Sequence, residues 1–331
     1  MKSNRDSNIE ILRIVLMTMI LLSHLITHGK YEFPDNSVIL SVQDAGILTF
    51  TRYHVNTFIL ISGFFGVSLN FRKIFGFSVM IFSWAFVGAV LDFVVFKHEA
   101  LTQIVASLLN PFMSGWFVIQ YFALMLYGPL INKGLEELST KQFSVILVIY
   151  LLYVYGVTPS IISSASPHTF EFVGMYLIGR YIKRIWPTIC KIKTTTIVCL
   201  NMLGGALFVM VVLSRTNSEL YNRLLSNQDP IVILMGVFLL LLVQRIQIGS
   251  VPALNRISSC VIAAYLITDC TMTGRMMDKL IYNFSCDNAL ILIFVSFALV
   301  VFFSILESCR KVVFKKLEDK LYNKLIEHIT V

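Results

Sequence analysis

Apolar runs of about twenty residues recur along this chain from one end to the other. Of its 331 residues, 56% are hydrophobic and only 14% are charged, whereas a soluble domain carries roughly 25% charged residues. About twenty apolar residues in a helix cross the ~30 Å hydrocarbon core of a bilayer, and a helix satisfies its own backbone hydrogen bonds, as lipid requires. The sequence therefore predicts an all-α, polytopic integral membrane protein.

Candidate spans are separated by breaks that carry Pro, Gly, Asn and charged residues. If the N-terminus is cytoplasmic, the inner segments hold nearly three quarters of the 27 Lys and Arg residues, as the positive-inside rule requires. We therefore expect about ten transmembrane helices with both termini in the cytoplasm. The expected spans cover residues 9–28, 47–69, 74–96, 114–132, 143–157, 170–186, 195–213, 229–244, 257–273 and 288–307.

The net charge of +8 does not indicate a nucleic-acid partner, because the basic residues fall in short loops between spans and follow membrane topology. The six cysteines are scattered, without a CxxC pair or a Cys/His cluster at metal-ligand spacing. We expect no nucleic acid, no metal and no disulfide framework.

Because the sequence shows no internal repeat and no low-complexity tract, we expect residues 1–307 to form one transmembrane domain. Residues 308–331 have the pattern of a basic amphipathic helix. We expect this tail to lie on the inner leaflet, where basic residues meet anionic lipid. A partner-binding helix is the alternative.

The first apolar run contains Arg13 and, eleven residues later, His24. Eleven residues at ~100° each fall within ~20° of three full turns, so both lie on one stripe, ~16 Å apart. Ionisable groups inside a span indicate a functional site. His24 is a candidate general base, with a helix–helix hydrogen bond as the alternative. Arg13 is either an anion-binding group or a snorkelling residue paired with Glu10, and His28 is interpreted as interfacial.

A second constellation runs from His54 to Gly66. Ser62 and Gly63 give a small face that allows close approach of another helix or a ligand. Counted from the outer surface, Ser62 lies ~12 Å deeper than His24, which is too far for a hydrogen bond. Residues nearer to His24 in depth are the better candidates for contacting its substrate: Arg52, His54 and Asn56.

Several stretches occur in an order that resembles acyltransferase family 3, a family of membrane O-acyltransferases. The Arg–x10–His spacing is preceded by Glu10 and followed by a Ser-Gly-Phe helix. Later stretches that agree are Trp116-Phe117 with Tyr127–Asn132, Met175–Ile182, Asn255–Ser258 and Ala264–Asp269. The resemblance is closest to the branch found in bacterial surface-polysaccharide loci.

The resemblance implies that His24 is catalytic, with Arg13 and Glu10 as its partners in the motif. It also implies that Ser62, Gly63, Arg72 and Lys73 contact the donor, the last two through the phosphates of coenzyme A. Trp116 and Asp269 would line the substrate site, although Trp116 is equally an interface anchor by composition. The chain departs from the family pattern at Ile59, at the basic loop and at Thr268, where many relatives have His.

The expected function is therefore transfer of an acyl group, most simply acetyl, from acyl-CoA to a cell-surface polysaccharide or its lipid-linked precursor. Expected partners are acyl-CoA as donor substrate, a glycan acceptor and membrane lipid, with no permanently bound cofactor and with a homo-oligomer left open. The expected location is the bacterial inner (plasma) membrane. Direct transfer and an acyl-histidine intermediate remain open. The alternative function is a transporter or flippase of a glycan intermediate, against which the missing repeats argue.

Overall fold

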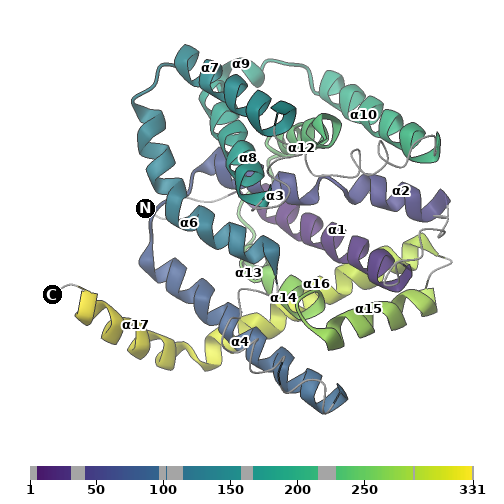
Figure 1. Ribbon diagram of the computed structural model, residues 1–331, viewed down its shortest axis with the longest axis vertical. Coiled ribbons are helices and arrows are strands. Elements are labelled where there is room, and N and C mark those ends of the chain that lie inside the picture. The colour runs from purple at the N-terminus through teal and green to yellow at the C-terminus, as the bar shows by residue number, and fades with distance from the viewer. Residues whose placement is uncertain are drawn as a thin grey trace. The chain divides into compact units, whose positions relative to one another are not determined.

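The computed structural model describes residues 6–30, 42–96, 102, 115–157, 167–214, 229–285 and 288–329. Every regular element in these ranges is a helix (Figure 1), as the apolar runs predict. The chain divides into two compact units. The first unit comprises Met1–Val38, Asn70–Ile119 and Gly249–Val331, and the second comprises Ile39–Leu69 and Gln120–Ile248.

The first unit is built around α1 (Asn8–Lys30), whose side chains Leu16, Met17, Leu21 and Leu25 are almost fully buried. Helix α1 packs against the elements that follow the second unit in sequence (Figure 1). These elements are α13 (Pro252–Ser258), α14 (Ile262–Thr268), α15 (Met272–Ser285) and α16 (Ala289–Val313). The other elements of the first unit are α4 (Phe71–Phe96), the first turn of α6 (Trp116–Glu136) and α17 (Lys315–Ile329).

The second unit is organised around the contact between α3 (His54–Phe65) and α8 (Pro167–Arg184). All side chains of α3 from His54 to Phe64 are buried. A Cβ at Gly63 would stand 2.3 Å from the backbone oxygen of Tyr176, and one at Gly179 would stand 2.4 Å from that of Leu60. The two backbones therefore touch, as small residues permit in membrane helix pairs. The other elements are α2 (Val42–Thr51), most of α6 (Trp116–Glu136), α7 (Thr140–Leu151), η2 (Leu152–Val157), α9 (Trp186–Ile189), α10 (Thr194–Ser214) and α12 (Pro230–Val243).

The expected count of ten spans is not reproduced. Within the described residues, three helices are long and apolar enough to cross a membrane, Asn8–His28, Phe71–Val95 and Ala289–Val313, or four if a bent pair counts as one span. That pair, Pro252–Thr268 with Thr273–Asn283, is bent by 92°. Other apolar helices are shorter: Thr140–Val154, Thr194–Met210 and Pro230–Val243.

Breaks inside the apolar runs explain the difference. The run expected at 47–69 is divided, because α2 ends at Thr51 and α3 begins at His54. The fourteen residues of α12 extend only ~21 Å at 1.5 Å per residue, which is less than a ~30 Å hydrocarbon core. The longest expected outer loop, 28–46, falls largely outside the described residues.

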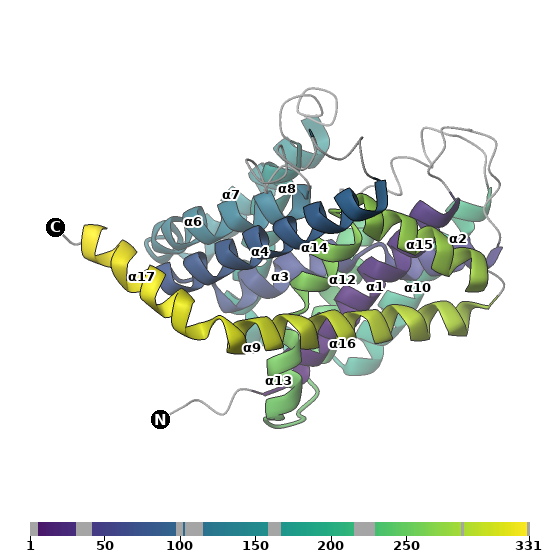
Figure 2. The same ribbon diagram turned by 90° about the horizontal axis from the view of Figure 1, so that it is seen from below.

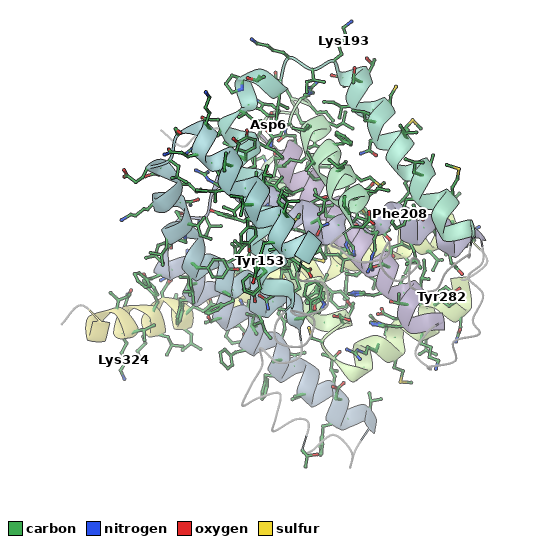
Figure 3. All side chains as sticks on the ribbon, turned by 45° about the horizontal axis from the view of Figure 1, so that its top comes forward. Asp6, Tyr153, Lys193, Phe208, Tyr282 and Lys324 are labelled. Carbon is green, nitrogen blue, oxygen red and sulfur yellow. The ribbon has the colours of Figure 1, made fainter. Side chains whose placement is uncertain are left out.

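Helix α17 follows α16 after a bend and reaches the beginning of α4 (Figure 2). There Arg72 forms an ion pair with Asp319 and lies 4.6 Å above the ring of Tyr322. The leucines at positions 317, 321 and 325 are about half exposed, and Lys324 points outward (Figure 3). One face of α17 is therefore held against the unit while an apolar stripe is left uncovered.

We predict that Gly179→Ala destabilises the second unit, because its Cβ would overlap the backbone of α3. Overpacking of this kind costs about 1–3 kcal/mol. Thermal unfolding of the purified protein in detergent should show a melting temperature lower by several degrees. Gly134→Ala, in α6 with no atom within 4 Å of its Cβ, is the matched control and should not lower it. Equal melting temperatures for both variants would contradict the close contact.

Candidate active site

Helix α1 presents two histidines, His24 and His28, on one face. Residues four apart in a helix are neighbours, and the two rings are stacked with centroids 5.2 Å apart and planes at 23°. The part of the helix that precedes them, from Ile14 to Leu22, is apolar except for Thr18. Its beginning is fixed by Ser7, whose hydroxyl donates to Asn255 at 2.8 Å. The two imidazoles are thus carried by a rigid, well-packed element.

Two carboxylates from a distant part of the chain face these histidines. Asp269 caps the C-terminal end of α14, and Asp278 lies on α15. The Nε2 of His28 is 3.4 Å from Oδ1 of Asp269, and its Nδ1 is 2.9 Å from Oδ2 of Asp278. The Nδ1 of His24 is 3.9 Å from the same Oδ1 of Asp269. The bend between α14 and α15 brings the two carboxylates to adjacent turns of α1.

Among these two histidines and two carboxylates, His24 has a ring nitrogen that makes no hydrogen bond to the described residues. Its Nδ1 is buried and has no hydrogen-bond partner among the described residues. The side chain as a whole is 20% exposed, so its accessible surface comes from its other atoms. A histidine can accept a proton from a bound molecule when one ring nitrogen is enclosed beside a carboxylate and the opposite edge of the ring is accessible.

An aromatic wall borders His24. The ring of Tyr265, on α14, lies 6.0 Å from that of His24, and Phe117 meets Tyr265 at 5.8 Å with the rings tilted by 69°. Trp116 adjoins Phe117 in the first turn of α6 and is 37% exposed. The predicted lining residue Trp116 is therefore linked to the ring of His24 through Phe117 and Tyr265, and Tyr265 becomes a further candidate for the lining.

Near the other end of α1, Arg13 is paired with Glu10. The Nη1 of Arg13 donates to both oxygens of Glu10, at 3.2 and 3.1 Å. Glu10 is only 3% exposed, and it also accepts a hydrogen bond of 2.5 Å from Ser258 on α13. The arginine side chain remains 24% exposed. Because guanidinium has five N–H donors, this pairing leaves donors free for a second anion.

The other residues predicted for the site lie on α4 or in the second unit. Arg72 is engaged by α17, while Lys73 is exposed in the first turn of α4. Arg52, His54, Asn56, Ser62 and Gly63 lie in the second unit, so their grouping with His24 stays a prediction. The Oγ of Ser62 donates to the backbone oxygen of Phe58, and Gly63 packs against Tyr176. These two contacts favour a packing role.

The sequence analysis interpreted His28 as interfacial, included Tyr265 only within a family stretch and gave no role to Asp278, although the structure places all three beside His24 or its neighbours. The four-residue spacing of the histidines was one available signal. Asp278 had no comparable signal, because its partner lies 250 positions away in the sequence.

We predict that Arg13→Gln destabilises the first unit, because it leaves the buried carboxylate of Glu10 without its cation. Removal of one partner from a buried ion pair costs about 3–5 kcal/mol. The double variant Glu10→Gln with Arg13→Gln should recover most of the loss, since no charge is then buried alone. Thermal unfolding in detergent measures both, with Arg13→Lys as the charge-conserving control. A double variant no more stable than the single one would show that the pair is not the cause.

The chain was compared with known proteins. Residues 6–307 match the family described as acyltransferase domain, acyltransferase family 3. Comparisons with curated proteins and with solved structures found no match. The matched range includes all four residues of the histidine–carboxylate cluster. Because the match covers nearly the whole chain, this protein belongs to acyltransferase family 3 and is a membrane acyltransferase.

Proposed function

We propose that this acyltransferase moves an acetyl group from acetyl-CoA to a hydroxyl of a cell-surface polysaccharide or of its lipid-linked precursor. The observation that carries the proposal is His24, a partly accessible imidazole with an enclosed Nδ1 beside a carboxylate, within an apolar helix. An imidazole is the side chain best suited to accept a proton near neutral pH. Its presence in a membrane span is costly and marks a functional position.

In the proposed reaction, the acceptor hydroxyl attacks the thioester carbonyl while His24 takes the hydroxyl proton. The new C–O ester bond forms, the C–S bond breaks, and the proton passes from His24 to the thiolate of coenzyme A. An acyl-histidine intermediate uses the same residue, with the imidazole itself attacking first. Both routes need an imidazole that is neutral and accessible at its reacting nitrogen.

The donor enters from the cytoplasm in this proposal. Arg13 lies eleven residues before His24 on α1, so it is ~16 Å away along the axis, toward the predicted cytoplasmic end. Its 24% exposed guanidinium and Lys73 are the proposed contacts for the phosphates of coenzyme A. Arg72 is a weaker candidate, because its guanidinium already pairs with Asp319. Ser62 and Gly63 are the proposed contacts from the second unit.

The acceptor occupies the outer half in the same proposal, with Arg52, His54, Asn56, Trp116 and Asp269 as its contacts. The protein would lie in a bacterial inner membrane with both termini cytoplasmic. The uncovered leucine stripe of α17, flanked by Lys320 and Lys324, is proposed to rest on anionic lipid of the inner leaflet.

A glycan transporter or flippase is the second candidate. The observation in its favour is the bent pair α14 and α15, because discontinuous helices at mid-membrane are a feature of transporters. In a transporter, however, removal of a single imidazole would change the amount of exported polymer and not its acyl content. The two functions therefore differ in a measurable product.

We predict that His24→Ala abolishes acetylation without loss of the protein from the membrane. Cells lacking the gene would be complemented with wild type, His24→Ala or Thr18→Ala, and their surface glycans analysed by mass spectrometry. Wild type should add one acetyl group per acceptor site. His24→Ala should add none, because no base remains to take the hydroxyl proton.

Thr18→Ala is the matched control, since Thr18 is buried on the same helix and its hydroxyl donates to the backbone oxygen of Ile14, within α1. It should retain acetylation. Full acetylation by His24→Ala would overturn the proposed role of this residue. A polymer that disappears without a change in acyl content would instead support transport.

A further inference from the structure

Asp278 is a buried charge that the proposed reaction does not use. Its side chain is 1% exposed on α15, and an unpaired carboxylate at such a position is strongly disfavoured. Its hydrogen bond to Nδ1 of His28, at 2.9 Å, supplies a partner. The pair joins α15 to α1 one turn beyond His24.

His28 has a carboxylate at each of its two ring nitrogens. Its Nδ1 meets Asp278, and its Nε2 is 3.4 Å from Asp269. A neutral imidazole has one N–H and one lone pair, so it can donate to only one carboxylate. With hydrogen on both nitrogens it donates to both, and its charge lies between two negative groups.

Asp269 is in turn shared by two imidazoles. The same Oδ1 that faces His28 lies 3.9 Å from Nδ1 of His24, the buried nitrogen without a hydrogen bond in the described part of the chain. Arg275 on α15 donates to the backbone oxygen of Asp269 at 3.2 Å. The backbone that carries this carboxylate is therefore held by α15 as well as by α14.

A carboxylate next to the Nδ1 of a catalytic histidine holds a hydrogen on that nitrogen and leaves Nε2 to act as the base. Distances of this kind are often long before substrate binds and shorten in the complex. A structural ion pair would need only His28 and Asp278. The additional contact with Asp269 gives the pair a direct connection to His24.

We propose that His28, anchored by Asp278, is a positioning residue that holds Asp269 against Nδ1 of His24. It thereby fixes the ring of His24 with Nε2 directed at the acceptor hydroxyl. This inference rests on the proposed role of His24 as the base. His28 does not touch the reacting atoms, and it acts through Asp269.

The first experiment measures transfer from [14C]acetyl-CoA in membrane vesicles of cells that make the acceptor and carry each variant. We expect His28→Gln and Asp278→Asn each to lower kcat about tenfold or more, as loss of an orienting partner does. The KM for acetyl-CoA should stay within about twofold, since neither residue binds the donor. The kcat of the double variant should be no lower than that of His28→Gln alone, because both substitutions break the same connection from Asp278 through His28 to Asp269.

Exchange of the two residues His28 and Asp278 distinguishes a positioning role of His28 from a purely stabilising one. His28→Asp combined with Asp278→His restores an ion pair between α1 and α15, but it turns a carboxylate toward Asp269. We expect the melting temperature in detergent to recover above that of Asp278→Asn, while kcat stays low. Recovery of kcat to the wild-type value would overturn the proposal and leave a purely structural pair.

Asp92→Asn is the matched control. The carboxylate of Asp92 accepts bonds from the backbone N–H and the hydroxyl of Thr273, at 2.8 and 2.6 Å. It therefore holds the same helix, α15, through Thr273. We expect its kcat to remain within about twofold of wild type. A loss as large as that of Asp278→Asn would show that any disturbance of α15 is sufficient, which would contradict the specific role of His28.

A measurement independent of activity uses protein labelled with [15N]histidine in lipid nanodiscs. The side-chain nitrogen signals of His24, assigned by their absence in His24→Ala, should shift in both His28→Gln and Asp278→Asn but not in Asp92→Asn, because the first two substitutions release Asp269 from its place beside Nδ1 of His24. His24 signals that are the same in wild type and in His28→Gln and Asp278→Asn would overturn the inference. If His24→Ala keeps full transfer, the proposed function fails. If only His24→Ala is inactive while the His28 variants keep their kcat, this inference alone fails.

Discussion

The cost of placing charge inside apolar helices governs the first unit. Helix α1 carries Glu10, Arg13, His24 and His28, and each meets a polar partner within the described residues. Most of these partners come from α13, α14 and α15, more than two hundred residues later in the chain. Packing of α1 against this C-terminal group therefore does two things at once. It buries leucines, and it neutralises groups that would otherwise be expelled from the membrane.

The second unit depends on a different constraint, the approach of two backbones. Gly63 and Gly179 leave no room for a Cβ between α3 and α8. The turn after α3 is closed by polar contacts, in which the hydroxyl of Tyr176 donates to Asn132 and accepts from the N–H of Val67. Ser62 and Gly63, which the family resemblance assigns to the donor, are thus also parts of a structural contact. A motif of small residues can serve helix packing and ligand binding alike, because both a neighbouring helix and a ligand need side chains that leave space close to the backbone.

The all-helical class and the pairing of Arg13 with Glu10 could be predicted from the sequence. Both are local: hydropathy decides the first, and a three-residue spacing on a helix permits the second. The count of spans could not be predicted in the same way. A run such as 47–69 has the composition of one helix, but the helix is interrupted at Arg52 and Tyr53, and composition does not report such a break. Tyr265 shows a similar limit, because its place 6.0 Å from the ring of His24 depends on the packing of α14 against α1.

The sequence by itself determined that this chain is helical and rich in apolar runs, which follows from hydropathy. Its ordered motifs gave the resemblance to acyltransferase family 3, and that resemblance, together with the position of an imidazole inside an apolar run, made His24 the candidate base. Only the tertiary structure decided which groups surround that base. His28 and Asp278 are 250 positions apart, and their contact requires the bend between α14 and α15 together with the packing of α15 on α1. No pattern within a single segment specifies such a pairing. The pair is favoured because a buried charge without a partner is costly, and its partner comes from whichever distant segment the fold places beside it.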